Sequence, residues 1–341
     1  MKKKNNTSAC AAKRTSIGGQ ALIEGIMMRG PEISAMAVRD PEGTIILERW
    51  ANETSNRPKI CKWPFVRGIF NFVDSMRAGY KALMRSAEIA GLEEETVAPS
   101  NEDAPSSKKT KSSKTKKEQG TPWYFNALMI LSAVLGVVIS VLLFMYLPSQ
   151  LYTWLVPAFP ALDGQYFVRA VFEGVLRILI FVGYMAAVSM MKDIKRTFMY
   201  HGAEHKTIFC FEQGLPLTIE NVKAQRRFHP RCGTSFLILM LLVSIVISMF
   251  IRIDNAFLRT GIKLLLIPLI VGIGYELIKL AGRKDNWFTR IISAPGMWLQ
   301  RISTKEPDED EMIQCAILAF MEVLPEEDQA KERAKIAETE N

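Results

Sequence analysis

The chain has 341 residues, of which 49% are hydrophobic, and its 43 lysines and arginines outnumber its 35 aspartates and glutamates to give a formal net charge of +8. The apolar residues are gathered in long runs rather than spread evenly, and this pattern excludes an ordinary soluble domain. The five cysteines fall in segments that are predicted below to be cytosolic, which argues against a disulfide framework.

The N-terminal part is predicted to be a small cytosolic unit rich in β-structure. Residues 1–14 are basic and polar, are predicted to be disordered, and lead into no apolar run, so we expect no signal peptide. Within 15–62, the segments "SAMAVRD" and "TIILERW" are joined by "PEG" and predict a β-hairpin. Ahead of them, "SIGGQALIEGIMMRGP" has glycines that suit tight turns but lacks the spacing of a phosphate-binding loop.

Residues 63–91 have the apolar period of an amphipathic helix whose basic side chains lie largely off the apolar face. Two placements are open: the helix lies in the cytosolic membrane interface, or it packs on the β-rich unit or on the membrane helices. Residues 92–121 are rich in Glu, Ser, Thr and Lys, and this composition predicts a disordered linker.

Four transmembrane helices are predicted within a bundle over 122–286. The first candidate carries no charge over 23 positions, which is enough to cross a hydrocarbon core of about 30 Å. The others hold a few charges that face the bundle or extend to the interface. The four spans cover about 125–147, 168–191, 235–251 and 256–281.

Lysines and arginines in the loops predict the orientation. The loop 148–165 contains no basic residue, whereas the loop 192–234 and the segments before the first span and after the fourth span are basic. We therefore expect a multi-pass protein of the bacterial cytoplasmic membrane with both termini in the cytoplasm. The positive cytosolic surface suits anionic lipid headgroups or a polyanion such as ribosomal RNA.

The C-terminal segment 287–330 is predicted to be helical, cytosolic and packed on the rest of the cytosolic part, and 331–341 is predicted to be a disordered tail. The expected fold is therefore an α-helical integral membrane protein with four transmembrane helices, a small cytosolic β-rich unit and cytosolic amphipathic helices.

The motif "HGAEH" is the strongest candidate for chemistry. His201 and His205 are four residues apart, so on a helix both imidazoles point the same way and suit one metal ion. Glu204 stands between them in the order His-x-x-Glu-His, in which one class of zinc peptidases uses the glutamate as a base. All three histidines of the chain lie between positions 201 and 229, which adds weight to the motif.

The number of protein ligands decides what such a site does. If His229 and Cys232 both join the first two histidines, the site is closed and structural. If three protein groups bind, a fourth position stays open and hydrolysis becomes feasible. Glu276 near the end of the last span is another candidate third ligand, unless it pairs with Lys279 on the same helix.

A reading without metal also stands. In it the two histidines of "HGAEH" hydrogen-bond Glu173 or Glu276 and hold the cytosolic loop on the bundle. In the second span Arg169, Glu173 and Arg177 recur every four residues, which predicts a Glu173–Arg177 pair within the helix or, less simply, part of a transport pathway.

Four blocks, "GGQALIEGIMMRGP", "HGAEHK", "HPRCGTSF" and "APGMWLQRISTKEPDEDEMIQCAILAF", occur in this order between Gly18 and Phe320. With them the chain resembles the YqhQ-like bacterial membrane proteins, the domain-of-unknown-function 1385 family. The resemblance implies a multispanning inner-membrane protein and a metal-dependent enzyme. It also implies binding roles for Glu24, Arg29 and Arg231, which stand in these blocks.

Two functional hypotheses follow. The first is a zinc-dependent hydrolase at the cytosolic face, with Glu204 as the base. The second is a non-catalytic accessory factor of membrane-protein biogenesis or envelope assembly, in which the basic surface docks a ribosome, a translocon or lipid and the histidines are architectural. Membrane lipids are partners in either case, specific DNA binding is not expected, and the sequence leaves homo-oligomerisation open.

Overall fold

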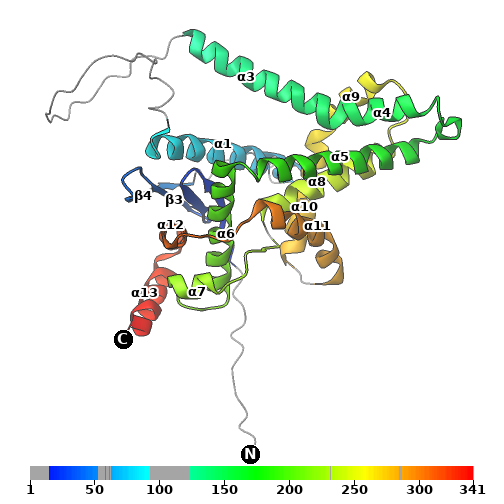
Figure 1. Ribbon diagram of the computed structural model, residues 1–341. Helices are drawn as coiled ribbons and strands as arrows, with labels where there is room; N and C mark the ends of the chain where they lie inside the picture. Colours follow the sequence, from blue (N-terminus) through cyan, green and yellow to red (C-terminus); the bar gives the residue numbers. More distant parts are fainter. Residues whose placement is uncertain are drawn as a thin grey trace, which may run out of the picture.

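The computed structural model describes residues 15–52, 58, 61, 63–92, 123–230, 232–283 and 286–340. The chain forms a small sheet enclosed by helices, and beside it a set of long apolar helices (Figure 1). The segment 1–14 and the linker 92–121 are both predicted to be disordered. Residues 1–14 and 93–121 lie outside the described residues.

The sheet has four antiparallel strands in the order β1-β2-β3-β4, with a hairpin between each pair. The strands are β1 (Gly18–Leu22), β2 (Gly25–Arg29), β3 (Ile33–Arg39) and β4 (Ile45–Ala51). The predicted hairpin is β3–β4, and the glycine-rich segment before it supplies β1 and β2. Side chains of β2 and β3 are buried on both faces of the sheet, so the centre of the unit is apolar throughout.

Helices cover both faces of the sheet. On one face, α6 (Lys192–Glu212) lies against β1 and β2, and α12 (Asp310–Val323) lies against β2 and β3. On the other face lies α1 (Val66–Ile89), which also packs along α10 (Ile267–Arg283). The predicted amphipathic helix therefore packs on the sheet and the bundle, which is one of the two placements that the sequence left open.

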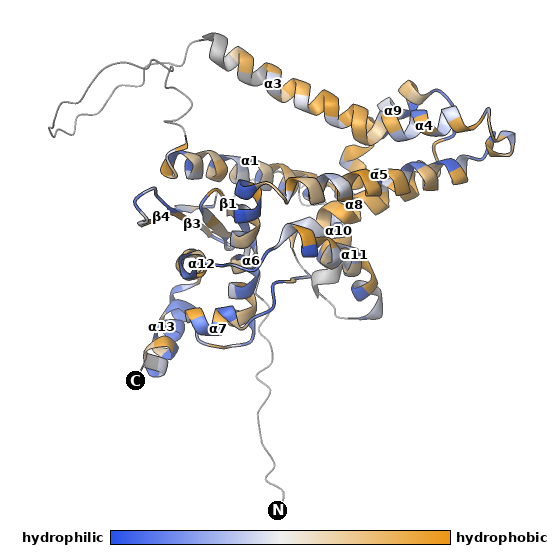
Figure 2. Ribbon diagram, viewed as in Figure 1, coloured by the Kyte–Doolittle hydropathy of each residue, from blue (hydrophilic) through white to orange (hydrophobic). Residues whose placement is uncertain are grey.

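The apolar helices are α3 (Trp123–Val141), the π-helical turn η2 (Leu142–Tyr146), α4 (Leu147–Leu155), α5 (Tyr166–Val188), α8 (Gly233–Ser248), α9 (Ala256–Leu265) and α10. Of these, α3, α5 and α8 are mostly orange, that is hydrophobic, in Figure 2. Two helices among the described residues, Leu131–Leu155 and Tyr166–Val188, are long and apolar enough to cross a membrane. A third is added if α9 and α10 count as one span.

Four transmembrane helices are therefore not confirmed. The fourth predicted span is broken, because α9 and α10 meet at an angle of 49°, next to Pro268, whose ring cannot continue the hydrogen bonding of the preceding helix. The third predicted span, α8, has 16 residues, so it is about 24 Å long against a core of about 30 Å. The helix that holds the first predicted span begins at Trp123 and continues through η2 and α4 to Leu155, so it extends past the predicted end at 147.

Charges on α5 are arranged differently from the predicted Glu173–Arg177 pair. Glu173 accepts a hydrogen bond from Arg169 Nε at 3.1 Å and pairs with Lys263 of α9. Arg177 instead donates its Nε–H to the carbonyl of Phe144 in η2, at 2.8 Å. The carboxylate therefore links two turns of α5 through Arg169 and links α5 to α9 through Lys263.

The remaining helices are the 3₁₀ turn η3 (Pro160–Leu162), α7 (Ile219–Lys223), α11 (Trp287–Ser303) and α13 (Glu326–Glu340). In the 287–330 segment only α12 packs on the sheet unit, whereas α11 packs on α8 and α10. The helix α13 extends through most of the predicted disordered tail 331–341. Three acidic residues in its first turn favour this helix, because they face the positive end of its dipole.

A short segment between α11 and α12 crosses α6 at close range. Lys305 N–H donates to the carbonyl of Phe198 at 2.8 Å. At Gly202 a Cβ atom would lie 1.9 Å from the carbonyl oxygen of Lys305, so only glycine permits this crossing. The crossing fixes the position of α6 relative to α11 and α12.

Ion pairs hold the same helix to the sheet. Arg196 of α6 pairs with Glu24 in the β1–β2 turn, and its Nη1 lies 2.7 Å from Glu309 Oε1 just before α12. Arg39 of β3 joins the same two carboxylates at 3.2 and 2.7 Å. The Tyr200 hydroxyl donates to Glu24 at 3.2 Å. A turn, a strand and two helices thus meet in one charged network.

We predict that Glu309→Gln lowers the free energy of unfolding at pH 7 by about 1–2 kcal/mol, because it removes charge-assisted hydrogen bonds that are partly open to water. Hydrogen bonds from Arg196 and Arg39 lower the pKa of Glu309 to about 2. The contribution is therefore complete above the unfolded pKa of about 4.3 and is lost as the pH falls toward 2.

Thermal unfolding in detergent between pH 7 and pH 2.5 measures both effects. Asp308→Asn, at the exposed neighbouring position, is the matched control and should change stability by less than about 0.5 kcal/mol. Equal stability of Glu309→Gln and the parent at pH 7 would contradict the stabilising role of the network.

Candidate metal centre

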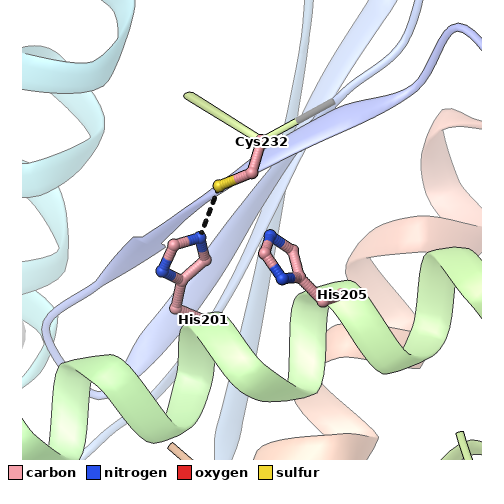
Figure 3. Close-up of side chains that lie close together, drawn as sticks. All are labelled: His201, His205 and Cys232. Atoms are coloured by element: carbon pink, nitrogen blue, oxygen red, sulfur yellow. Dashed lines mark hydrogen bonds between the residues drawn. The ribbon is translucent and has the colours of Figure 1, made fainter. Parts of the chain in front are cut away.

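His201 and His205 lie one turn apart on the same face of α6, as their spacing predicted (Figure 3). Their ring centroids are 4.5 Å apart. His201 is half-buried and His205 is 1% exposed. The helix therefore presents two imidazoles side by side in a largely dry environment.

Cys232 completes the group from a distant part of the chain. It is the residue before α8, and its extended backbone turns the side chain toward α6. Its Sγ lies 3.1 Å from His201 Nε2, and one ligand atom from each of the three residues lies within 4.8 Å of the others. Zinc bonds of about 2.0–2.3 Å at tetrahedral angles place ligands roughly 3.3–3.8 Å apart, so small side-chain movements would fit an ion here.

Hydrogen bonds to the backbone orient both imidazoles. Nδ1 of His201 lies 2.8 Å from the carbonyl oxygen of Ser303, and Nδ1 of His205 lies 2.5 Å from that of Arg227. A carbonyl only accepts, so each Nδ1 carries a proton, and Nε2 is the nitrogen that remains to bind a metal. His205 Nε2 is buried and has no hydrogen-bond partner among the described residues. A metal ion would satisfy that nitrogen, so the group fits a metal.

The charges of the group favour the metal-binding form of the cysteine. Burial alone would raise the pKa of Cys232, but the nearby positive charges of His201 and His205 outweigh burial and hold this pKa well below its ordinary value. Burial likewise opposes protonation of His201, and the charge of Cys232 overcomes it and raises the pKa of His201 to about 9. A thiolate is the form in which cysteine binds metals.

Glu204 stands beside this group, at the wall of a cavity. Its side chain is 4% exposed, and its Oε2 has no hydrogen-bond partner in the described part of the chain. Burial raises the pKa of Glu204, while the charges of the two histidines and the amide of Gly19 lower it less strongly. The cavity has a volume of about 330 Å³ and is also lined by Gly19, His205 and Cys232. The carboxylate and two of the three ligand residues therefore face the same space.

His229 lies close to the group but outside it. Its ring centroid is 5.7 Å from that of His205, and its Nε2 is 3.7 Å from Glu212 Oε2 at the end of α6. Gln300 of α11 holds its backbone, accepting from His229 N–H at 2.8 Å and donating to its carbonyl at 2.7 Å. Among the described residues, the ligand group therefore has three members rather than the four of a closed site.

Glu276 is placed elsewhere. Its carboxylate pairs with Arg67 of α1, with Nε 2.6 Å from Oε1, so its partner is neither a metal-ligand group nor Lys279. Glu173 is engaged inside the bundle by Lys263. The histidines therefore use backbone carbonyls rather than either glutamate, and the reading in which the glutamates hold the loop is wrong.

The three residues that the resemblance singled out for binding are dispersed. Glu24 belongs to the charged network with Arg196 and lines a separate cavity of about 230 Å³. Arg29 ends β2 and pairs in register with Gly18. Arg231 lies outside the described residues.

Sequence reasoning missed the residues that support the site. Ser303, Gln300 and Glu212 are ordinary helix residues by type and spacing. Ser303 and Gln300 fall in the block "APGMWLQRISTKEP", which carries the resemblance, and that is the one signal that could have pointed to them.

Comparison with known proteins gives a family. The profile described as "Protein of unknown function (DUF1385)" matches residues 63–326. The chain belongs to the DUF1385 family. It is also similar to the "Uncharacterized protein YqhQ" of Bacillus subtilis (strain 168), with 34% identity over 309 residues that cover 90% of this chain and 92% of the relative. No solved structure matches the chain.

The DUF1385 match includes all three residues of the ligand group and Glu204. It begins after the sheet, so the β1 residues that line the cavity lie before it. The site therefore combines family residues with a neighbouring sheet that the family profile does not include.

We predict that Gly19→Ala disturbs the site while Gly18→Ala leaves it unchanged. A Cβ atom at Gly19 would lie 2.7 Å from Cγ and Cδ of Glu204, whereas one at Gly18 meets nothing within 4 Å. Gly19→Ala should destabilise the protein by about 1–3 kcal/mol, because it overpacks a buried contact. Unfolding midpoints of the two variants check this, and equal midpoints would contradict the close approach of β1 to Glu204.

Proposed function

We propose that this protein is a membrane-embedded, metal-dependent hydrolase whose site is the cavity beside α6. One observation carries the proposal: two members of the three-residue ligand group, His205 and Cys232, line the same cavity as Glu204, a buried carboxylate with an unpartnered oxygen. Sites with three protein ligands and an open fourth position are typical of catalytic zinc, whereas structural zinc sites are closed by four.

Zinc is the metal that suits this donor set. Two imidazole nitrogens and one thiolate are borderline and soft ligands, which favour zinc over magnesium or calcium. His201, His205 and Cys232 would hold the ion. The hydrogen bonds from Nδ1 of the two histidines to backbone carbonyls would fix the ligand geometry. When bound, zinc supplies Lewis-acid activation of water and of a substrate carbonyl or phosphoryl group.

Glu204 would act as the proton carrier. It accepts the proton of the attacking water at Oε2, and afterwards gives that proton to the leaving group. The backbone of Gly19 in β1 packs closely against the side chain of Glu204, so the carboxylate is held in place rather than free to rotate. Burial of the surrounding side chains keeps bulk water from competing with these steps.

The cavity limits what reaches the site. A volume of about 330 Å³ is at the lower end of the range for small-molecule pockets. A single hydrolysable bond with its nearest substituents fits this space, and a folded protein does not. The basic residues of the 192–234 segment favour a cytosolic position for the cavity, where cysteine stays reduced.

We predict that the protein purified from cells or reconstituted with zinc binds a stoichiometric amount of metal, and that His205→Ala and Cys232→Ala lose it. Loss of one of three ligands should weaken metal binding by at least about 100-fold. Elemental analysis by mass spectrometry measures the metal. Cys210→Ala, a buried cysteine on α6 outside the ligand group, is the matched control and should keep the metal.

We also predict that Glu204→Gln keeps the metal and loses hydrolytic turnover by about 100-fold or more, because a proton carrier contributes about that much. A panel of fluorogenic ester, amide and phosphate substrates identifies the activity in the parent. Cobalt replacement distinguishes the open site from a structural one. If azide does not alter the visible spectrum of the cobalt protein, the fourth position is closed and the hydrolase proposal fails.

A further inference from the structure

A second buried cluster of charge lies in the bundle, at the end of α5 remote from α6 (Figure 1). Its centre is Glu173, the side chain of which is 1% exposed. The cluster links α5 to α9 and to the end of the first span. Four cationic side chains surround the centre: Arg169, Arg177, Arg259 and Lys263.

Positive charge exceeds negative charge in this cluster. Glu173 is the one buried carboxylate there among the described residues, and its two oxygens already serve Arg169 and Lys263. Asp254 adds a second carboxylate 3.6 Å from Arg169 Nη1, but its side chain is 77% exposed. Buried charge without compensation is costly, and it persists in proteins when a partner or a bound ion neutralises it.

Arg259 has an unused pair of donors. Its Nη1 donates to the carbonyl of Ile253 at 2.9 Å, whereas Nε and Nη2 are buried and have no hydrogen-bond partner in the described part of the chain. These two groups form one edge of the guanidinium, which matches two oxygens of a single oxyanion. Glu173 Oε1 lies 3.5 Å from Nε and fills only part of this edge.

Arg177 supplies a further free donor. Its Nε donates to the carbonyl of Phe144 in the π-helical turn η2, and its Nη1 donates to Ser244 Oγ of α8 at 2.6 Å. Its Nη2 is buried without a partner among the residues described. Arg177 lies one turn after Glu173 on α5, and Arg259 lies one turn before Lys263 on α9. Isolated π-helical turns are often found at functional sites, and this one holds Arg177 in place.

We propose that this cluster binds a phosphate group, held on the Nε–Nη2 edge of Arg259 with Arg177 and Lys263 nearby. Guanidinium groups bind phosphate bidentately and strongly when shielded from water. Arg169 and Arg259 lie in the first turns of α5 and α9, and lipid headgroups occur at the ends of membrane-spanning helices. The phosphate belongs either to an anionic phospholipid or to free phosphate, and the two sources share this chemistry.

Asp254 stands at the exposed edge of the cluster. Its Oδ2 accepts from the Tyr166 hydroxyl at 3.3 Å, and its Oδ1 faces Arg169. A phosphate group that approaches from this side meets the negative charge of the aspartate, which pairs with Arg169. Removing the charge of Asp254 should therefore strengthen phosphate binding, whereas removing the charge of Arg259 should weaken it.

The test uses the full chain, purified in a maltoside detergent that has no phosphate group. The washed protein is assayed for retained phosphorus, and its unfolding midpoint is followed as phosphatidylglycerol, diacylglycerol or inorganic phosphate is added. We expect phosphatidylglycerol to raise the midpoint and diacylglycerol, which lacks the phosphate, to leave it unchanged. A comparable rise with inorganic phosphate assigns the site to the free anion.

Three variants sharpen the test. Arg259→Gln should weaken binding about tenfold, because a buried charge-assisted hydrogen bond is lost, and Asp254→Asn should strengthen it. Arg252→Gln, at an exposed position near the same end of the bundle, is the matched control. The proposal fails if neither phosphate source raises the midpoint of the parent. It also fails if Asp254→Asn and Arg252→Gln respond alike. Both outcomes remain measurable even if Arg259→Gln does not fold.

Discussion

The close crossing of α6 by the segment from Ser303 to Glu309 is the contact on which the rest of the structure depends. It is permitted by Gly202, at which any larger side chain would strike the carbonyl of Lys305. The same segment orients His201 through the Ser303 carbonyl and delivers Glu309 to the charged network. One short connection therefore sets both the position of the helix and the direction of its first histidine.

Clustered charge is handled in two different ways in this molecule. In the sheet unit, Arg196 and Arg39 alternate with Glu24 and Glu309, so opposite charges compensate one another. Around Glu173 and around His205 the compensation is incomplete, and donors or lone pairs are left without partners among the described residues. Incomplete satisfaction of buried polar groups is expected where a ligand binds. Both candidate sites thus contain buried polar atoms without partners. The histidine site lacks a cation, and the cluster around Glu173 lacks an anion.

Local pattern was enough to predict the parts of the site that lie on one element. Helical spacing placed His201 and His205 together, and the short block around Cys232 marked it as a partner. The same reasoning failed for Glu276, because its partner Arg67 lies on α1, more than 200 residues earlier. The close approach of Gly19 to Glu204 could not be predicted either, since no local property of β1 reveals which helix covers it. Composition located the long apolar helices, but the break beside Pro268 and the short α8 leave two or three helices that are long enough to cross a membrane.

The order of these contacts along the chain bears on how the site is assembled during synthesis. His201, His205 and Cys232 are all made before α8, whereas Ser303 and Gln300, which orient His201 and hold the backbone of His229, follow the last apolar helix. When Cys232 has been synthesised, all three ligand residues are present. The Ser303 carbonyl that orients His201 has not yet been made. The ligand group therefore acquires its final geometry only after α11 has been made and has packed on α8.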